Sequence, residues 1–342
     1  MLLKYVIYRF LAAIPTLFGL SILVFTLTRL VGDPAAIYIH PDMTPEDIER
    51  VKELYGFDKP IYVQYIYWLR GVLRGDLGYS VTANMPVVDA IKTFLPATIE
   101  LAVYSFTLSL IIGVYLGTKA AANKDRLVDH LTRLLALSGY SIPVFWLALM
   151  LLYVFYNVLD FVGPGRLSLE VRFKYMPPYG DFKFYTGLLT VDAILNRNME
   201  VFIDAVKHLI PPVLTQTYIH VAIFLRVLRS SMIEEMNKEY VDFAISKGLP
   251  RDRVLREYVR RNSYIALVNI AGLQFVGLMT GVVLTETVFN WPGLGRFAAN
   301  AAIQLDPAAV VGFTLFVGVL FIVVNLVVDI LLAYLDPRIR YE

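Results

Sequence analysis

Residues 234–262 read EEMNKEYVDFAISKGLPRDRVLREYVRRN, a strongly charged run that lies between two long apolar segments. Gly248-Leu249-Pro250 stands near its centre, where glycine tolerates left-handed backbone angles and proline ends a preceding helix. We therefore predict one short helix over 241–247 and a second over 251–259. The run would then form a helix–turn–helix bracket between two membrane spans.

The rest of the chain has the composition of a membrane protein. Hydrophobic residues make up 57% of the 342 residues, which is too many for an ordinary soluble domain. A helical span needs about 20 mostly apolar residues. Runs such as 310–328 are continuous, whereas barrel strands are short and alternate with polar residues. We therefore predict six transmembrane helices over residues 5–30, 97–121, 131–159, 209–228, 264–289 and 309–335.

The basic residues predict an orientation, because short cytoplasmic loops carry an excess of lysine and arginine. The loop between the second and third spans and the 234–262 run are both rich in these residues. With six spans, both loops and both termini fall on the same side of the membrane. We expect that side to be cytoplasmic.

Two long segments, 31–96 and 160–207, are expected on the outer side. The first predicts an α-rich lobe, with one helix starting at Thr44-Pro45 and another over 64–73. The second is rich in aromatic residues, which we expect to form the core of a small lobe. Sugar stacking and docking of a binding protein are the alternatives.

These boundaries divide the chain into four parts. They are an N-terminal transmembrane helix over 1–30, the outer lobe over 31–96, a core of five spans over 97–335 and a tail over 336–342. The core includes the outer loop 160–207 and the charged loop 231–262.

No residue set in the sequence predicts catalysis or metal binding by this chain. The absence of cysteine excludes disulfides and thiolate metal sites. The sequence lacks a G-x-x-x-x-G-K-[ST] phosphate loop, an H-E-x-x-H pair and a G-x-S-x-G motif. We therefore expect no enzyme activity, no bound cofactor and no metal site in the chain itself.

Several polar or turn-forming residues near the ends of the last two spans are candidates for a gate or a translocation path. Glu286 could line the path, since an ionisable group at membrane depth is costly, but we favour a hydrogen bond to the backbone of the following turn. Asn325 and Asp329 are expected to pair with neighbouring helices, with solute contact as the alternative, and Gln274 could either face the cavity or pair with a neighbouring helix. The full set is Gln274, Glu286, Trp291, Pro292, Gly293, Gly295, Asn325 and Asp329.

The pattern Tyr240-Val241-x-x-Ala244-x-x-Lys247-Gly248-Leu249 resembles the EAA loop of ABC importer permeases in the dipeptide/oligopeptide/nickel group. Asp242-Phe243 departs from it, because the broader family has Glu-Ala there. Other stretches that resemble this group are Ile14–Gly19 with Arg29–Pro34, Gly75–Ser80 with Leu95–Leu101, and Glu286–Arg296 with Asp329 and Asp336–Tyr341.

This resemblance implies an all-α membrane protein with six transmembrane helices and the type I ABC importer permease fold. It also implies a permease subunit of an ATP-driven, binding-protein-dependent importer of di- or oligopeptides. An importer of oligosaccharides is the alternative, and an ATP-independent secondary carrier is a weaker one, since the sequence shows no inverted repeat.

The same resemblance implies the partners and the coupling residues. The partners would be a second homologous permease in a heterodimer, an external solute-binding protein and two cytoplasmic ATPases that use ATP and Mg²⁺. All would work at the cell membrane of a prokaryote. The residues expected to contact the ATPases are Glu239, Tyr240, Asp242, Ala244, Lys247, Gly248, Leu249, Pro250 and Arg251.

Overall fold

The computed structural model describes residues 2–30, 39, 42–54, 56–57 and 59–335. The predicted tail 336–342 lies outside these residues, as does the family-like stretch 31–34. The described chain is helical apart from one two-stranded antiparallel ribbon. The α-helices are α1 Leu2–Leu30, α2 Pro45–Leu54, α3 Ile61–Leu73, α4 Val87–Ala122, α5 Leu127–Ser141, α6 Val144–Tyr153, α7 Leu169–Tyr175, α8 Leu189–Leu195, α9 Met199–Met236, α10 Glu239–Ser246, α11 Arg251–Val254, α12 Arg260–Met279, α13 Val283–Val288, α14 Leu294–Ile303 and α15 Pro307–Leu335. The π-helical segments are η2 Val154–Val158 and η3 Leu255–Val259, and the strands are β1 Tyr79–Ser80 and β2 Met85–Pro86.

The membrane-spanning helices confirm the all-α membrane class. Five segments of the described chain are long and apolar enough to cross a membrane, and a sixth follows if the bent pair α5 with α6–η2 is one span. These six correspond to the six predicted spans.

Two predicted spans are wrong in detail because each contains a break. The predicted helix over 131–159 bends by 98° between α5 and α6. Pro143 disfavours helical angles in the residue before it, and Ile142 is extended with ψ of 121°. The predicted helix over 264–289 is interrupted between α12 and α13, where Gly281 has a φ of +91° that favours glycine.

Two other helices begin earlier than the sequence predicts. α4 starts at Val87 and α9 at Met199, each several residues before the apolar run. The predicted lobe boundary at 96 therefore falls inside α4, and the last residues of the predicted outer loop, 199–207, form the first turns of α9.

α9 is the central helix of the bundle. It is the most buried of the predicted spans and α1 is the least buried. Gly113 of α4 and Gly139 of α5 let these helices approach α9 closely: a Cβ atom would lie 2.5 Å from the Cβ of Phe224 and 2.6 Å from the Cβ of Ala222, respectively. Small residues at such crossings allow the backbone contact that holds membrane helices together.

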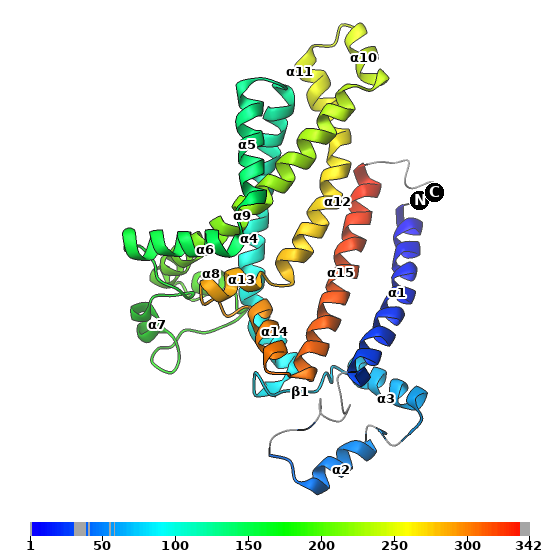
Figure 1. Cartoon of the computed structure of the whole chain (residues 1–342), viewed down its shortest axis with the longest axis vertical. Coiled ribbons are helices and arrows are strands. Elements are labelled where there is room, and N and C mark those ends of the chain that lie inside the picture. Colours follow the sequence, from blue (N-terminus) through cyan, green and yellow to red (C-terminus); the bar gives the residue numbers. More distant parts are fainter. Residues whose placement is uncertain (1, 31–38, 40–41, 55, 58, 336–342) are drawn as a thin grey trace.

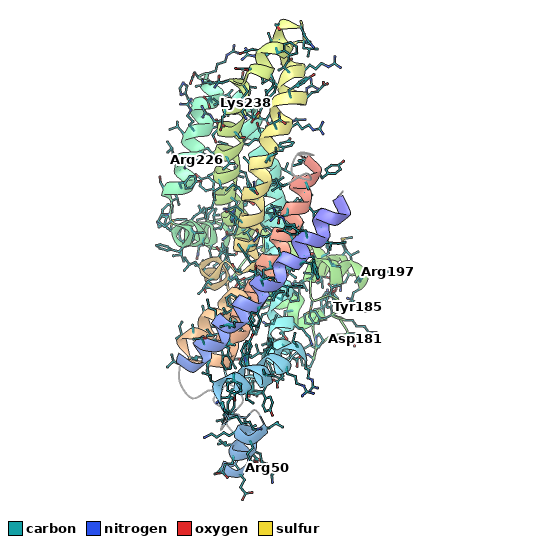
Figure 2. All side chains as sticks on the ribbon, turned by 90° about the vertical axis from the view of Figure 1, so that its right-hand side faces the viewer. Arg50, Asp181, Tyr185, Arg197, Arg226 and Lys238 are labelled. Carbon is teal, nitrogen blue, oxygen red and sulfur yellow. The ribbon has the colours of Figure 1, made fainter. Side chains whose placement is uncertain are left out.

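The molecule is elongated, with different elements at its two ends (Figure 1). α10 and α11 form one end, and α2, α3 and the β-ribbon lie at the other, while α6 projects sideways from the bundle. The first residues of α1 and the last of α15 point toward the α10–α11 end. Figure 2 places Lys238 toward that end and Arg50 at the opposite one.

The lobe between α1 and α4 is anchored on α1. Trp68 of α3 is buried against Val24 and Phe25 of α1, and the hydroxyls of Tyr65 and Ser21 are 2.7 Å apart. The predicted helix start at Thr44-Pro45 is confirmed, because α2 begins at Pro45 and the Asp47 amide donates to Thr44 Oγ1 at 3.3 Å.

The aromatic residues of segment 160–207 divide into buried and exposed groups. Phe182 is buried with Val171, Met176 and Leu189 in a small core, and Tyr175 packs against it. The expectation of an aromatic core is wrong for the others, whose side chains are 41–68% exposed: Phe161, Phe173, Tyr179, Phe184 and Tyr185. Figure 2 shows Tyr185 projecting from this lobe, near Asp181 and Arg197.

Candidate functional site

The charged segment folds as a helical hairpin that stands on the ends of the bundle helices. α9 ends at Met236, α10 covers Glu239–Ser246, and Gly248 turns the chain with a φ of +80°. α11 and η3 then lead without a gap into α12. The predicted bracket of two helices around Gly248-Leu249-Pro250 is therefore confirmed, and its second arm is continuous with a membrane span.

The inner face of this hairpin is apolar and fixed to the bundle. Val241, Ala244 and Val254 are buried with the ends of α4, α9 and α12 in one cluster. This burial makes the hairpin a rigid extension of those helices. Ala244 therefore packs inward, whereas its neighbours on α10 face outward.

Tyr240 connects the two arms of the hairpin. Its hydroxyl donates to Glu235 near the end of α9 and accepts from Asn262 Nδ2 of α12 at 3.0 Å. Burial, with the Glu235 hydrogen bond as the second cause, raises the pKa of Tyr240 to about 12. The phenol therefore keeps its proton at neutral pH and acts as the donor to Glu235.

The outer face of the hairpin is a mixed aromatic and basic surface. Phe243 is 61% exposed and Ile245 is 50% exposed, and Lys247 Nζ lies 4.3 Å from the centre of the Phe243 ring. The predicted contact residues on this exposed surface are Glu239, Asp242, Lys247, Gly248, Pro250 and Arg251, while Tyr240 and Leu249 are half-buried. An exposed aromatic ring beside cations on a rigid base is suited to binding another protein.

A second group of predicted residues meets around the turn between α13 and α14. Glu286 is fully buried, and its Oε1 accepts from Thr98 Oγ1 of α4 at 2.8 Å, while Oε2 accepts from the Arg296 amide at 2.7 Å. Trp291 is buried and donates from Nε1 to the Ala97 carbonyl at 2.8 Å. The Leu294 amide donates to Thr98 Oγ1 at 2.7 Å.

The glycines of this turn leave room for the Glu286 carboxylate. A Cβ atom on Gly293 would lie 2.1 Å from Glu286 Oε1, and one on Gly295 would lie 2.7 Å from the Gly281 Cα. The structure thus places Glu286, Trp291, Gly293 and Gly295 in one compact junction with α4. Pro292 is on its exposed side.

The other path candidates lie outside this junction. Gln274 Oε1 is 2.8 Å from His220 Nδ1, which joins α12 to α9. Asp329 of α15 forms an ion pair with Arg9 of α1 at 3.2 Å. Asn325 is half-buried and makes no hydrogen bond among the residues that the structure describes.

Two buried ion pairs have no counterpart in the sequence-based candidates. Asp129 of α5 is fully buried and accepts from Arg229 Nε of α9 at 2.5 Å and from Arg133 at 2.7 Å. Glu100 of α4 accepts from Arg166 at 2.6 Å and from the Thr190 amide at 2.8 Å. The pairing of Asp129 with Arg229 was not predictable from the sequence, because partners 100 residues apart leave no local pattern.

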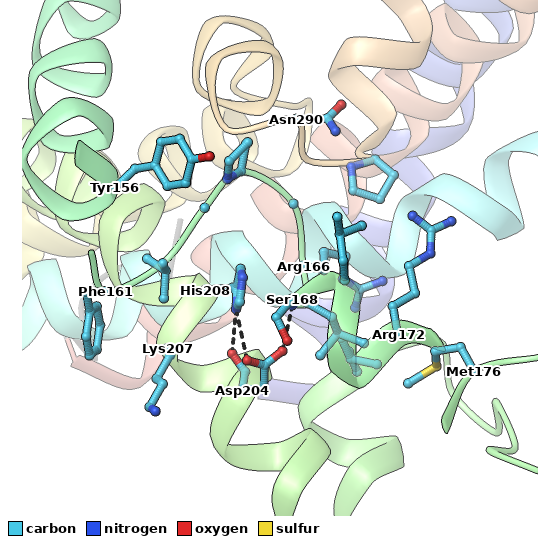
Figure 3. Close-up of a pocket in the computed structure, with 18 of the residues that line it drawn as sticks. Tyr156, Phe161, Arg166, Ser168, Arg172, Met176, Asp204, Lys207, His208 and Asn290 are labelled. Carbon is cyan, nitrogen blue, oxygen red and sulfur yellow. Dashed lines mark hydrogen bonds and ion pairs between the residues drawn. The ribbon is translucent and has the colours of Figure 1, made fainter. Parts of the chain in front are cut away.

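A cavity of about 950 Å³ lies beside α7, between residues 160–169, the first turns of α9 and the 290–292 turn (Figure 3). Of the predicted gate residues it touches only Pro292. Most of its charged side chains come from the predicted outer loop 160–207, and Arg296 comes from α14; none of them was among the predicted gate residues. Neither here nor in the rest of the described chain are three His, Asp or Glu side chains close enough to hold a metal ion.

Comparison with known protein families gives two matches that together cover almost the whole chain. Residues 109–341 match the model described as binding-protein-dependent transport system inner membrane component. Residues 2–102 match the corresponding N-terminal model of binding-protein-dependent transport system membrane components.

Individual relatives are similar over nearly their full length. The probable D,D-dipeptide transport system permease protein of Escherichia coli strain K12 is 38% identical over 94% of this chain and 93% of its own. The dipeptide transport system permease protein of the same strain is 35% identical over 100% of both chains. The glutathione transport system permease protein of Escherichia coli O6:H1 is 32% identical, again over 100% of both.

Proposed function

This chain belongs to the family of binding-protein-dependent transport system inner membrane components, and on that premise we propose that it is a permease subunit of an ATP-driven importer of di- or oligopeptides. The observation that carries the coupling role is the rigid hairpin over 239–259, with its exposed Phe243 and Lys247. The peptide cargo is inferred from the relatives, whose names specify dipeptides, D,D-dipeptides and glutathione.

In this proposal the hairpin faces the cytoplasm and is gripped by two ATPase subunits that bind ATP and Mg²⁺. A second permease subunit, expected to be a different chain, completes the pathway, and an external binding protein delivers the peptide. The complex lies in the cell membrane of a prokaryote, with both termini of this chain in the cytoplasm. ATP binding must change how the ATPases contact the hairpin, since equal contact in both states would shift no equilibrium.

The packing of the hairpin supports a lever mechanism. Its buried residues belong to the same cluster as the ends of α9 and α12, and Tyr240 joins those two helices directly. A displacement of α10 is therefore expected to move α9 and α12 together as a rigid body. α12 leads to α13, so this movement reaches the Glu286–Trp291 junction at the other end of the span.

The coupling role is tested by assembly of the complex. We expect Phe243→Asp or Asp242→Lys to abolish co-purification of the ATPases, since the first replaces the exposed aromatic contact by a carboxylate and the second reverses a charge on the exposed face of α10. Thermal unfolding of the permease should stay within about 0.5 kcal/mol of the wild type, because both side chains are exposed. Arg50→Glu, at the opposite end of the molecule, is the matched control. Normal ATPase capture and uptake by both hairpin variants would refute the assignment.

The cargo is tested in proteoliposomes that contain the complete transporter. We expect uptake of labelled dipeptide to need ATP in the vesicle lumen, which takes the place of the cytoplasm. It should also need the cognate binding protein outside the vesicle. Uptake of oligosaccharides but not peptides would favour the alternative cargo. Uptake driven by an ion gradient without ATP would instead indicate a secondary carrier.

A further inference from the structure

The cavity beside α7 is large enough to hold a small solute. Its volume of about 950 Å³ lies at the upper end of the range typical of ligand sites. α7, which contributes to the lining, lies in the half of the molecule away from the hairpin (Figure 1), so in the proposed orientation the cavity is on the outer side. One wall is the 290–292 turn, which joins the Glu286–Trp291 junction.

Two cations of the lining, Arg172 and Lys207, lack carboxylate partners among the described residues. Within the described ranges, the Arg172 guanidinium forms no hydrogen bond or ion pair, and Lys207 contacts only the Phe161 ring, 5.9 Å from its centre. Arg296 donates to the neutral amide oxygen of Asn290 at 2.5 Å, and its charge also interacts with the buried Glu286 carboxylate. Arg166 forms an ion pair with Glu100 at 2.6 Å. Figure 3 places Arg166 and Arg172 on one side of the cavity and Lys207 on the other.

The acids of the lining form no ion pair with these two cations. Asp204 Oδ2 accepts from the Ser168 amide at 2.7 Å, and Oδ1 lies 3.7 Å from His208 Nδ1. Asp160 is the other lining carboxylate, and it is exposed. Arg172 and Lys207 thus remain without an acidic partner, while Asp204 is already engaged by the protein. An unpaired guanidinium and an unpaired ammonium group favour a ligand with a carboxylate.

The rest of the lining is apolar and aromatic. Tyr156, Phe161, Met176, Phe184 and Leu189 form walls that can contact side chains of varied shape. A charged anchor beside adaptable apolar walls suits a ligand class whose members share one charged end and differ elsewhere. Peptides have this character, because every member carries a C-terminal carboxylate.

We propose that this cavity is a receiving site for the C-terminal carboxylate of the imported peptide, held by Arg172 before the peptide enters the membrane pathway, with Lys207 adding to the positive potential from across the cavity. The proposal rests on the proposed peptide-import function. It concerns a site on the permease itself, separate from recognition by the binding protein. A concave site with apolar walls fits a small ligand better than the flat surface of a partner protein.

The test uses the absence of cysteine from this chain, which makes any introduced cysteine a unique label. Leu169→Cys places the label in the lining, and Tyr179→Cys places it on the same lobe outside the lining. The two side chains are equally exposed, at 69% and 68%. Labelling rates with an anionic and a cationic methanethiosulfonate are measured on the assembled transporter in nanodiscs, with partner cysteines replaced.

We expect the ratio of anionic to cationic labelling to be roughly three- to tenfold higher at position 169 than at 179, the effect of a nearby unit charge in water. A dipeptide with a free C-terminus should slow labelling at 169 but not at 179, and its C-terminal amide should not. Arg172→Gln in the Leu169→Cys background should lower both effects. Lys174→Gln is the matched control, since Lys174 lies on α7 outside the lining and pairs with Glu200 at 2.9 Å.

Equal labelling ratios at the two positions would overturn the proposal, as would equal protection by the free and amidated peptides. Protection by the binding protein but not by peptide would also overturn it and identify a docking surface instead. The labelling ratio tests the site and can be measured without transport. The import function is tested separately, and it fails if the wild-type transporter takes up no peptide in the presence of ATP. The two failures are therefore distinguishable.

Discussion

One buried carboxylate, Glu286, organises the turn between α13 and α14. It accepts hydrogen bonds from Thr98 on α4 and from the Arg296 amide beyond the turn, and Gly293 leaves the space that it occupies. This geometry is the one expected of a residue that holds the backbone of the turn. A residue free to bind solute would keep at least one oxygen unengaged.

We predict that Glu286→Ala destabilises the permease, because it leaves buried donors without an acceptor. Each such group costs on the order of 1–3 kcal/mol. Thermal unfolding of the purified complex measures the loss, and Glu286→Gln, which keeps one acceptor oxygen, should lose less. If Glu286→Ala unfolds at the wild-type temperature while transport is lost, the residue acts on the solute rather than on the turn.

At the scale of elements, the α5–α9 contact depends on a buried ion pair as well as on close backbone packing. Asp129 has no exposed surface and is engaged by Arg229 across the helix contact and by Arg133 on its own helix. Gly139 brings the same two helices together further along. The pair thereby fixes both the rotation and the position of α5 relative to the central helix.

Breaking this pair is predicted to be costly. Asp129→Asn leaves Arg229, which is only 18% exposed, without a compensating charge, and loss of one partner of a buried pair costs roughly 3–5 kcal/mol. Asp125→Asn is the matched control, because Asp125 is 67% exposed and its ion pair with Arg133 is worth at most about 1 kcal/mol. Chemical or thermal unfolding of the two variants compares them directly, and similar losses would show that burial of the pair is unimportant.

At the scale of the whole molecule, the two ends of the bundle have different roles in the proposed function. The hairpin lies at one end, and the start of α1 and the end of α15 point toward it. The lobes with the cavity lie toward the other end. The proposed orientation assigns the first end to the cytoplasm.

Single cysteines test this orientation. A membrane-impermeant maleimide is expected to label Tyr185→Cys in intact cells and Lys238→Cys only in inverted vesicles, since both side chains are exposed. Labelling of Lys238→Cys in intact cells would invert the orientation and with it the coupling role of the hairpin.

The sequence predicted the features that depend on local composition. Long apolar runs identified the six spans, because a helix in lipid satisfies its own backbone hydrogen bonds. Gly248 and Pro250 predicted the hairpin turn. Glycine permits left-handed backbone angles and proline ends the preceding helix, and neither effect needs a distant contact. The bend at Pro143 also has a local cause, because proline disfavours helical angles in the residue before it. The prediction missed it because the sequence is hydrophobic on both sides of Pro143.

The candidate site was predictable only where a turn or loop pattern marks it. Glu286 and Trp291 stand out because they flank a Pro-Gly turn in an apolar region. The cavity residues Arg172, Lys207 and Arg296 do not, because they are separated by up to 124 residues and share no motif. Their charges look like ordinary loop charges until the fold brings them together.

The amino-acid sequence alone therefore determined the membrane class, the helical spans and the hairpin, because hydrophobicity, glycine and proline act over a few residues. Only the tertiary structure decided which polar groups face each other. It paired Asp129 with Arg229 and Glu100 with Arg166, seated Glu286 against Thr98, and left Arg172 without an acid among the described residues. Charge interactions act through space, so their partners are set by how the helices cross and not by their order in the chain.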